Sequence, residues 1–185
     1  MRTILLDGIW SLPGRMRGLQ RCLLAAGCPH VDVFTYDASG RVRFDVLGGQ
    51  LAERIRSGDG PVNLVGFSMG GLVIRAALCE DPQIPLRRAV FLNTPHQGSK
   101  MAFLPLEGVR QMRPGSAFLR RLHAQPWGVP TLAMWCPGDM MVVPGSSARW
   151  ERATRTLQSG VPIHVWPLFS RSVHAEVAKF LTAPE

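Results

Sequence analysis

The chain alternates short runs of consecutive apolar residues with longer segments in which apolar residues recur every three or four positions. The short runs are typical of strands buried on both faces of a parallel sheet, and the longer segments are typical of helices. Strands are expected at residues 3–6, 31–36, 62–66, 88–93, 131–136 and 163–168, and helices at 14–26, 44–57, 69–80, 116–123, 147–158 and 174–181.

This alternation predicts a single α/β domain over residues 1–185: a doubly wound, mainly parallel sheet of about six strands with helices on both faces. One region, about residues 95–129, has several glycines and prolines and only a short helical pattern. Its length without regular periodicity favours a lid or functional loop insertion. In sheets of this kind, the functional site lies beyond the carboxyl ends of the strands.

The segment Gly66-Phe67-Ser68-Met69-Gly70-Gly71 directly follows the expected third strand. A serine between two glycines at a strand-to-helix turn is the pattern of a nucleophile elbow, which presents the serine hydroxyl above the sheet. Glycine is needed on both sides because the backbone segments of this turn approach each other too closely for side chains. Ser68 is therefore the predicted nucleophile.

A serine nucleophile requires a base and an orienting acid, which in this topology follow later strands in the order serine, acid, histidine. Asp139 lies in the turn after the fifth expected strand, and His174 follows the sixth, where a helix begins. The positions and the order therefore predict a triad of Ser68, Asp139 and His174.

The other four histidines are alternatives for the role of base. His164 lies inside the sixth expected strand, so its ring is expected to point into the core or the helix layer. His96 follows the strand beside the nucleophile strand, but as a base it would break the chain order. His96 is therefore interpreted as a structural histidine or a wall of the substrate pocket. His30 and His123 are expected to lie far from the site.

The negatively charged intermediate of acyl transfer requires two backbone N–H donors. Met69 follows the nucleophile at a helix N-terminus, and Ile9 lies in the loop after the first expected strand. These two residues are the predicted oxyanion hole. Trp10 and His96 are expected to contact substrate, and residues 101–104 are expected to form an apolar wall or a small lid, with ordinary loop packing as the alternative.

Several motifs together resemble those of a known family: Gly66–Gly71, the stretch Phe91-Leu92-Asn93-Thr94-Pro95-His96-Gln97-Gly98-Ser99, Gly138-Asp139 with Val143-Pro144, and His174. Over nearly its whole length the chain is similar to α/β-hydrolases of the small bacterial lipase and esterase type. The resemblance implies hydrolysis of carboxylic esters without a cofactor. One departure is that the family usually has His-Gly after the first strand, where this chain has Asp7-Gly8. A carboxylate near the oxyanion would oppose catalysis, so Asp7 must point away or pair with an arginine such as Arg15 or Arg17.

The formal net charge is +8, and Glu107 is the only acid between residues 83 and 138. One interpretation is weak contact with an anionic membrane surface or substrate; the other is a solvated, arginine-rich surface. Nucleic-acid binding is not expected, because the arginines are scattered and no recognition motif is present. The four cysteines lack metal-ligand spacing, so no metal is expected, and the short apolar N-terminus predicts a cytoplasmic location.

These features predict a serine hydrolase that cleaves a small-molecule or lipid ester through an acyl-enzyme on Ser68. Two alternatives stay open. An acyltransferase or perhydrolase would use the same triad with an acceptor other than water. A non-catalytic binding protein on a hydrolase scaffold is the second alternative, which the departure at Asp7 supports.

Overall fold

The computed structural model describes residues 1–184 and contains one six-stranded sheet. The strands lie in the order β2-β1-β3-β4-β5-β6, and every neighbouring pair is parallel. The order reverses at β1, because β2 pairs with one of its edges and β3 with the other. This confirms the predicted α/β fold class. The strands are β1 (Arg2–Leu6), β2 (His30–Val33), β3 (Val62–Phe67), β4 (Leu86–Leu92), β5 (Thr131–Trp135) and β6 (Arg155–Gln158).

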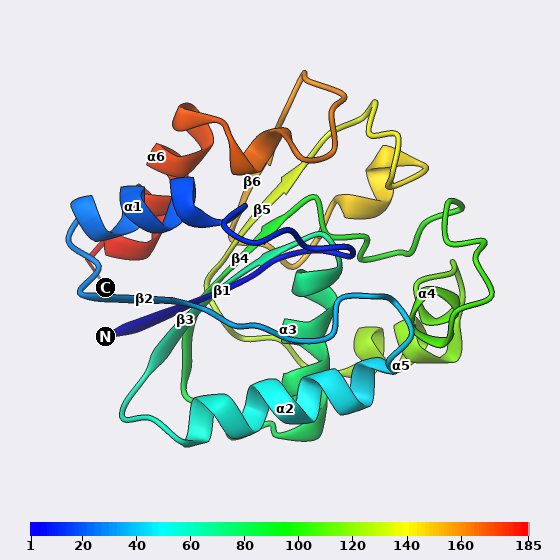
Figure 1. Ribbon diagram of the computed structural model, residues 1–185, viewed down its shortest axis with the longest axis horizontal. Coiled ribbons are helices and arrows are strands. Elements are labelled where there is room, and N and C mark those ends of the chain that lie inside the picture. The colour runs from blue at the N-terminus through cyan, green and yellow to red at the C-terminus, as the bar shows by residue number, and fades with distance from the viewer. Residues whose placement is uncertain (185) are drawn as a thin grey trace.

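Helices cover both faces of the sheet, with α1 and α6 on one side and α2 and α3 on the other (Figure 1). The four central strands are almost completely buried, as their runs of consecutive apolar residues require. None of the helices in residues 1–184 has the length and hydropathy of a membrane span. The helices are α1 (Arg17–Ala25), α2 (Phe44–Arg56), α3 (Met69–Glu80), α4 (Glu107–Gln111), α5 (Ala117–Ala124) and α6 (Arg171–Thr182).

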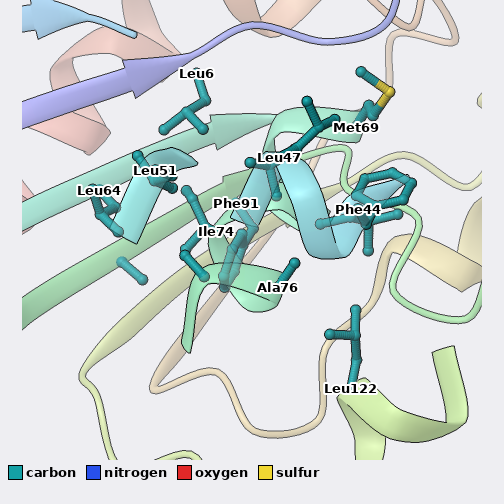
Figure 2. Packing of buried hydrophobic residues seen from close by; sticks show 14 of the residues in the cluster. Leu6, Phe44, Leu47, Leu51, Leu64, Met69, Ile74, Ala76, Phe91 and Leu122 are labelled. Atoms are coloured by element: carbon teal, nitrogen blue, oxygen red, sulfur yellow. The ribbon is translucent and has the colours of Figure 1, made fainter. Parts of the chain in front are cut away.

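The larger core lies between the sheet and the pair α2 and α3 (Figure 2). Phe44, Leu47 and Leu51 recur at helical spacing on α2 and are fully buried against α3 and the strands. Gly48 lets the two helices approach, since a Cβ there would stand 2.7 Å from the Ala76 carbonyl carbon. This packing holds the N-terminus of α3 in place, and α3 follows directly after Ser68.

The structure contradicts two of the predicted elements. Residues 163–168 are not a strand but a loop and a short 3₁₀ helix (Trp166–Leu168), while the sixth strand is Arg155–Gln158, within the segment predicted as the helix 147–158. The reason is that β6 is a mostly exposed edge strand, so it needs no apolar run. Of the apolar residues at 163–168, Leu168 and Val165 pack in the smaller core with α6, whereas Ile163 and Trp166 are exposed.

The irregular region at 95–129 forms loops around α4 and α5. Within it, Arg113 donates to the carbonyls of Ala102 and Phe103 and so ties residues 101–104 to the end of α4. The region packs through Val109 and Phe118 on the larger core, where Phe118 stacks on Phe44. These contacts fix the position of residues 101–104 beside the site. The single-domain boundary and the role of a lid stay predictions.

Candidate active site

The turn after β3 has the geometry of a nucleophile elbow. Ser68 has φ 51° and ψ −121°, a backbone conformation that residues other than glycine rarely adopt. A Cβ on Gly66 would stand 2.5 Å from the Gly71 Cα, and one on Gly70 would stand 2.5 Å from the Asp7 carbonyl oxygen. Both glycines are therefore required by close backbone approach, and the elbow directs the Ser68 hydroxyl toward the carboxyl edge of the sheet.

A continuous chain of hydrogen bonds connects Ser68, His164 and Asp139. The Ser68 Oγ lies 2.9 Å from His164 Nε2, and His164 Nδ1 lies 2.7 Å from Asp139 Oδ2. With its proton on Nδ1, the imidazole donates to the carboxylate and can accept the serine proton at Nε2. The His164 side chain is 11% exposed and its ring packs on Phe67. The arrangement is that of a nucleophile, a base and an orienting acid.

Asp139 is held in its charged form by its neighbours. Burial raises the pKa of the carboxyl, but hydrogen bonds from His164 and from the backbone N–H groups of Val142 and Met141 outweigh this and hold the pKa below its ordinary value. Those N–H groups donate to Oδ1, which leaves Oδ2 for the imidazole. A charged carboxylate in this position both orients the ring and stabilises an imidazolium.

The structure corrects the assignment of the base: His164, and not His174, lies against Ser68. His174 is buried inside α6, where its Nε2 donates to the Leu168 carbonyl at 3.0 Å and its ring lies under Gly18. Burial lowers the pKa of His174, so the ring is kept neutral. The misassignment follows from the shifted sixth strand. Because β6 ends at Gln158, His164 lies in the loop after the sixth strand. His174 lies within α6, which begins at Arg171.

A sequence signal for His164 was available. Pro162 and Pro167 flank it, and a proline in the middle of a segment argues against a strand because it cannot donate to the ladder. Treating 159–170 as a loop would have placed His164 after a late strand and preserved the order serine, acid, histidine.

One segment, residues 93–99, is bonded to the loops of both the acid and the base. At its start, Asn93 has φ 48° and its amide donates to the His164 carbonyl at 2.9 Å. At its end, the Ser99 hydroxyl donates to the Met141 carbonyl at 2.8 Å and accepts from the Val143 N–H at 3.0 Å. The motif after β4 therefore fixes where Asp139 and His164 stand relative to the sheet.

The loop after β1 presents the Ile9 N–H beside the site. Among the hydrogen bonds of residues 1–184 outside helices and strands, none is donated by Ile9, whereas Trp10 N–H donates to the Ala38 carbonyl. Met69 is the first residue of α3, and the N–H groups of the first helical turn have no intrahelical acceptor. Both donors are thus available for an oxyanion; their catalytic role stays a prediction.

Asp7 is turned away from these donors by an ion pair. Arg15 binds its carboxylate with two nitrogens at 2.7–3.0 Å, and the Gly8 N–H donates to Asp7 Oδ1 at 2.7 Å. The arginine also lies over the Phe67 ring. Of the two arginines considered from the sequence, Arg15 is the partner. The pair neutralises the carboxylate and stabilises the turn that carries Ile9.

A small apolar cavity opens beside Ser68 and His164. Its wall has no charged side chain, and segment 101–104 contributes Met101, Ala102 and Leu104, as expected for an apolar wall. Trp10 also lines it, as expected. In full, the lining residues are Ile9, Trp10, Ser68, Pro95, Ser99, Met101, Ala102, Leu104, Val109, Met112, Met141, Val142 and His164.

His96 does not line this cavity, which corrects its expected contact with substrate. It is completely buried, packed edge-on against Phe91 and under Trp150. The Arg75 guanidinium lies 3.4 Å from its Nδ1 and 5.0 Å from the Trp150 ring. Burial and this cation lower the pKa of His96 well below its ordinary range. His96 is a neutral structural histidine.

Fold and site together define an α/β architecture with a nucleophile elbow at the topological switch between β1 and β3. The family model described as the alpha/beta hydrolase family matches residues 7–184, and the chain belongs to this family. A search of curated proteins gives no match. No group of three or more metal-binding side chains in residues 1–184 is arranged to hold a metal ion.

Solved structures share the fold at low sequence identity. Lipase B of Aspergillus fumigatus is 19% identical with a TM-score of 0.67, over 86% of this chain and 42% of the lipase chain. The lipase BlEst2 of Bacillus licheniformis is 16% identical with a TM-score of 0.70, over 97% of this chain and 89% of the other. A bromoperoxidase from Bacillus anthracis is also 16% identical, with a TM-score of 0.73 over 98% and 92%. This chain thus spans less than half of the Aspergillus lipase.

Proposed function

We propose that the protein is a serine hydrolase that cleaves carboxylic esters. The observation that carries this proposal is the hydrogen-bonded series Asp139–His164–Ser68 above an elbow that only glycines permit. The uncharged cavity beside it suits an apolar acyl group.

In the proposed reaction, Ser68 Oγ attacks the ester carbonyl while His164 Nε2 takes its proton. The N–H groups of Ile9 and Met69 hold the resulting oxyanion, and Asp139 stabilises the imidazolium. His164 then gives the proton to the leaving alcohol, which leaves an acyl group on Ser68. Water, activated by the same imidazole, hydrolyses the acyl-enzyme and restores the serine hydroxyl.

A fluorophosphonate probe followed by mass mapping tests the nucleophile. We expect one adduct, on Ser68, and no adduct on Ser68→Ala. A series of p-nitrophenyl esters of increasing chain length then measures turnover and acyl preference. A wild-type protein that neither reacts with the probe nor turns over any ester would leave the binding-protein alternative as the better account.

An acyltransferase or perhydrolase would carry the same residues and differ in the acceptor. Product analysis with an alcohol or hydrogen peroxide in competition with water separates these activities. A carboxylic acid as the main product supports the hydrolase; a new ester or a peracid as the main product supports the alternative.

A further inference from the structure

Exposed apolar side chains gather in the four loops that follow β1, β4, β5 and β6. Thirteen large apolar side chains are exposed in residues 1–184, and nine of them lie in these loops. Single exposed apolar residues are ordinary on proteins, but a cluster of this kind is not. We call the nine the apolar rim: Trp10, Leu12, Met101, Phe103, Met140, Met141, Ile163, Trp166 and Phe169.

The apolar rim lies at the same edge of the sheet as the candidate active site. All strands are parallel, so these four loops lie at the carboxyl edge of the sheet (Figure 1). Ser68, directly after β3, lies at the same edge. Trp10, Met101 and Met141 line the cavity itself while remaining 40–53% exposed, and Ile163 immediately precedes His164. The four exposed apolar residues outside the rim lie at the start of the chain, on α1, on β2 and on α2.

The same loops carry no exposed acid near the cavity. Asp7 and Asp139 are both buried and paired, with Arg15 and His164. Glu151 belongs to the far end of its loop, next to Arg152, which binds carbonyls at the end of α5. Lys100 and Arg149 in these loops, and Arg17 and Arg171 at the starts of the helices that follow, are exposed and take part in no ion pair within residues 1–184. Glu107, at the start of α4, is exposed but paired with Arg43.

We propose that this edge docks on a lipid surface that carries anionic headgroups. Rim side chains such as Phe103 and Met140 would enter the boundary between headgroups and acyl chains, while Lys100 and Arg149 contact phosphates. A second copy of the chain would bring the same positive charge to this face and be repelled. Docking would place the cavity opening on the lipid and does not depend on the proposed hydrolysis.

Vesicle co-sedimentation tests the proposal on the full chain. The two probes are vesicles of phosphatidylcholine alone and of phosphatidylcholine mixed with phosphatidylserine. The rim variant is Phe103→Ser/Met140→Ser, two side chains 65% and 68% exposed that do not line the cavity. The matched control is Leu24→Ser/Val46→Ser, two side chains 47% and 48% exposed that lie outside the rim on α1 and α2. A charge variant is Lys100→Glu.

We expect the wild type and the control to bind the phosphatidylserine vesicles more tightly than phosphatidylcholine alone, and added salt to weaken this binding. The rim variant should bind the phosphatidylserine vesicles at least about tenfold more weakly than the wild type. Binding by Lys100→Glu should lie between that of the wild type and that of the rim variant. Turnover of a dissolved p-nitrophenyl ester by the rim variant reports the site separately from docking. Failure of the wild type to bind phosphatidylserine vesicles, or equal binding by the rim variant, would overturn the proposal. So would a wild-type dimer that the rim variant converts to a monomer, since a second copy would then cover the rim.

Discussion

His164 and His174 are ten positions apart, yet they occupy opposite kinds of environment. His164 lies in a loop, and both of its ring nitrogens face side chains, the Asp139 carboxylate and the Ser68 hydroxyl. His174 lies within α6, where its Nε2 donates to the Leu168 carbonyl, and no carboxylate of residues 1–184 forms an ion pair with it. A carbonyl can only accept a hydrogen bond, so it fixes a ring in place without preparing it to exchange protons.

The comparison shows that position near a strand end is not sufficient for a base. His174 satisfies the chain order and the topology, but a helix with its own backbone bonds holds the residue away from the sheet edge. His164 reaches the serine because it lies in the loop before the 3₁₀ helix Trp166–Leu168, where the amide of Asn93, directly after β4, donates to its carbonyl.

The largest expected difference is between His164→Ala and His174→Ala. The first should lower kcat for ester hydrolysis on the order of 10⁴-fold or more, as loss of a triad base does. The second should change kcat by less than about tenfold and lower stability by about 1–3 kcal/mol, because it leaves a cavity and an unpaired carbonyl. Steady-state kinetics and urea denaturation on both variants measure the contrast. Equal losses of kcat would contradict the assignment of roles.

Asp139→Asn tests how the acid sets the ring. Asparagine can keep Oδ1 as the acceptor for Met141 and Val142, which turns its amide nitrogen toward His164 Nδ1. The ring would then carry its proton on Nε2, facing Ser68, and could not act as a base. We expect kcat to fall about 10³–10⁴-fold with little change in melting temperature. Wild-type turnover in this variant would mean that Asp139 does not orient the base.

Asn93→Gly should have an intermediate effect on the His164 side of the comparison. Glycine accepts the positive φ of this position, so the change removes the amide donor to the His164 carbonyl without adding backbone strain. We expect kcat to fall about ten- to a hundredfold while KM for a short ester is nearly unchanged, since the base is displaced but the cavity is intact. Asn93→Asp, which also tolerates this conformation but cannot donate, should behave similarly. A loss confined to KM would contradict a positioning role.

The smallest expected effect concerns pH and His174. Its pKa is lowered by burial, so below about pH 6.5 the unfolded chain binds a proton there that the folded protein does not. Stability should therefore fall as pH decreases from the unfolded pKa toward the folded one, by at most about 1.4 kcal/mol per pH unit for one proton. Urea midpoints at about pH 7.5 and about pH 5.5 should show a smaller fall in His174→Gln than in the wild type. Part of the fall should persist, because His96 and His123 also have lowered pKa values.

Local sequence patterns predicted most of the fold and the nucleophile elbow. The elbow is readable because its glycines are required by contacts within a few residues, and β3, β4 and β5 are readable because buried strands need apolar runs. Asp139 was placed correctly beside the site because β5 is one of these strands.

The position of the candidate base was not readable by the same rules. β6 is Arg155-Thr156-Leu157-Gln158, an edge strand with a polar sequence. The nearby apolar run at 163–168 forms a loop and a 3₁₀ helix instead of a strand. Of the two interpretations of His96, the pocket wall was wrong for a related reason: the loop after β4 turns inward, so His96 is covered by Trp150 and does not line the cavity. In both cases the position of the histidine depends on tertiary contacts, which the periodicity of apolar residues along the chain does not reveal.

The bonds of segment 93–99 have a consequence for inactivation by heat. The loop that carries Asp139 and the loop that carries His164 are hydrogen-bonded to opposite ends of segment 93–99, which begins directly after β4. Loosening that stretch would displace both groups at once, so the two loops form one cooperative unit rather than two independent ones. Residual activity and local proteolysis of residues 136–170 should then change together over one narrow temperature interval, below the melting of the sheet.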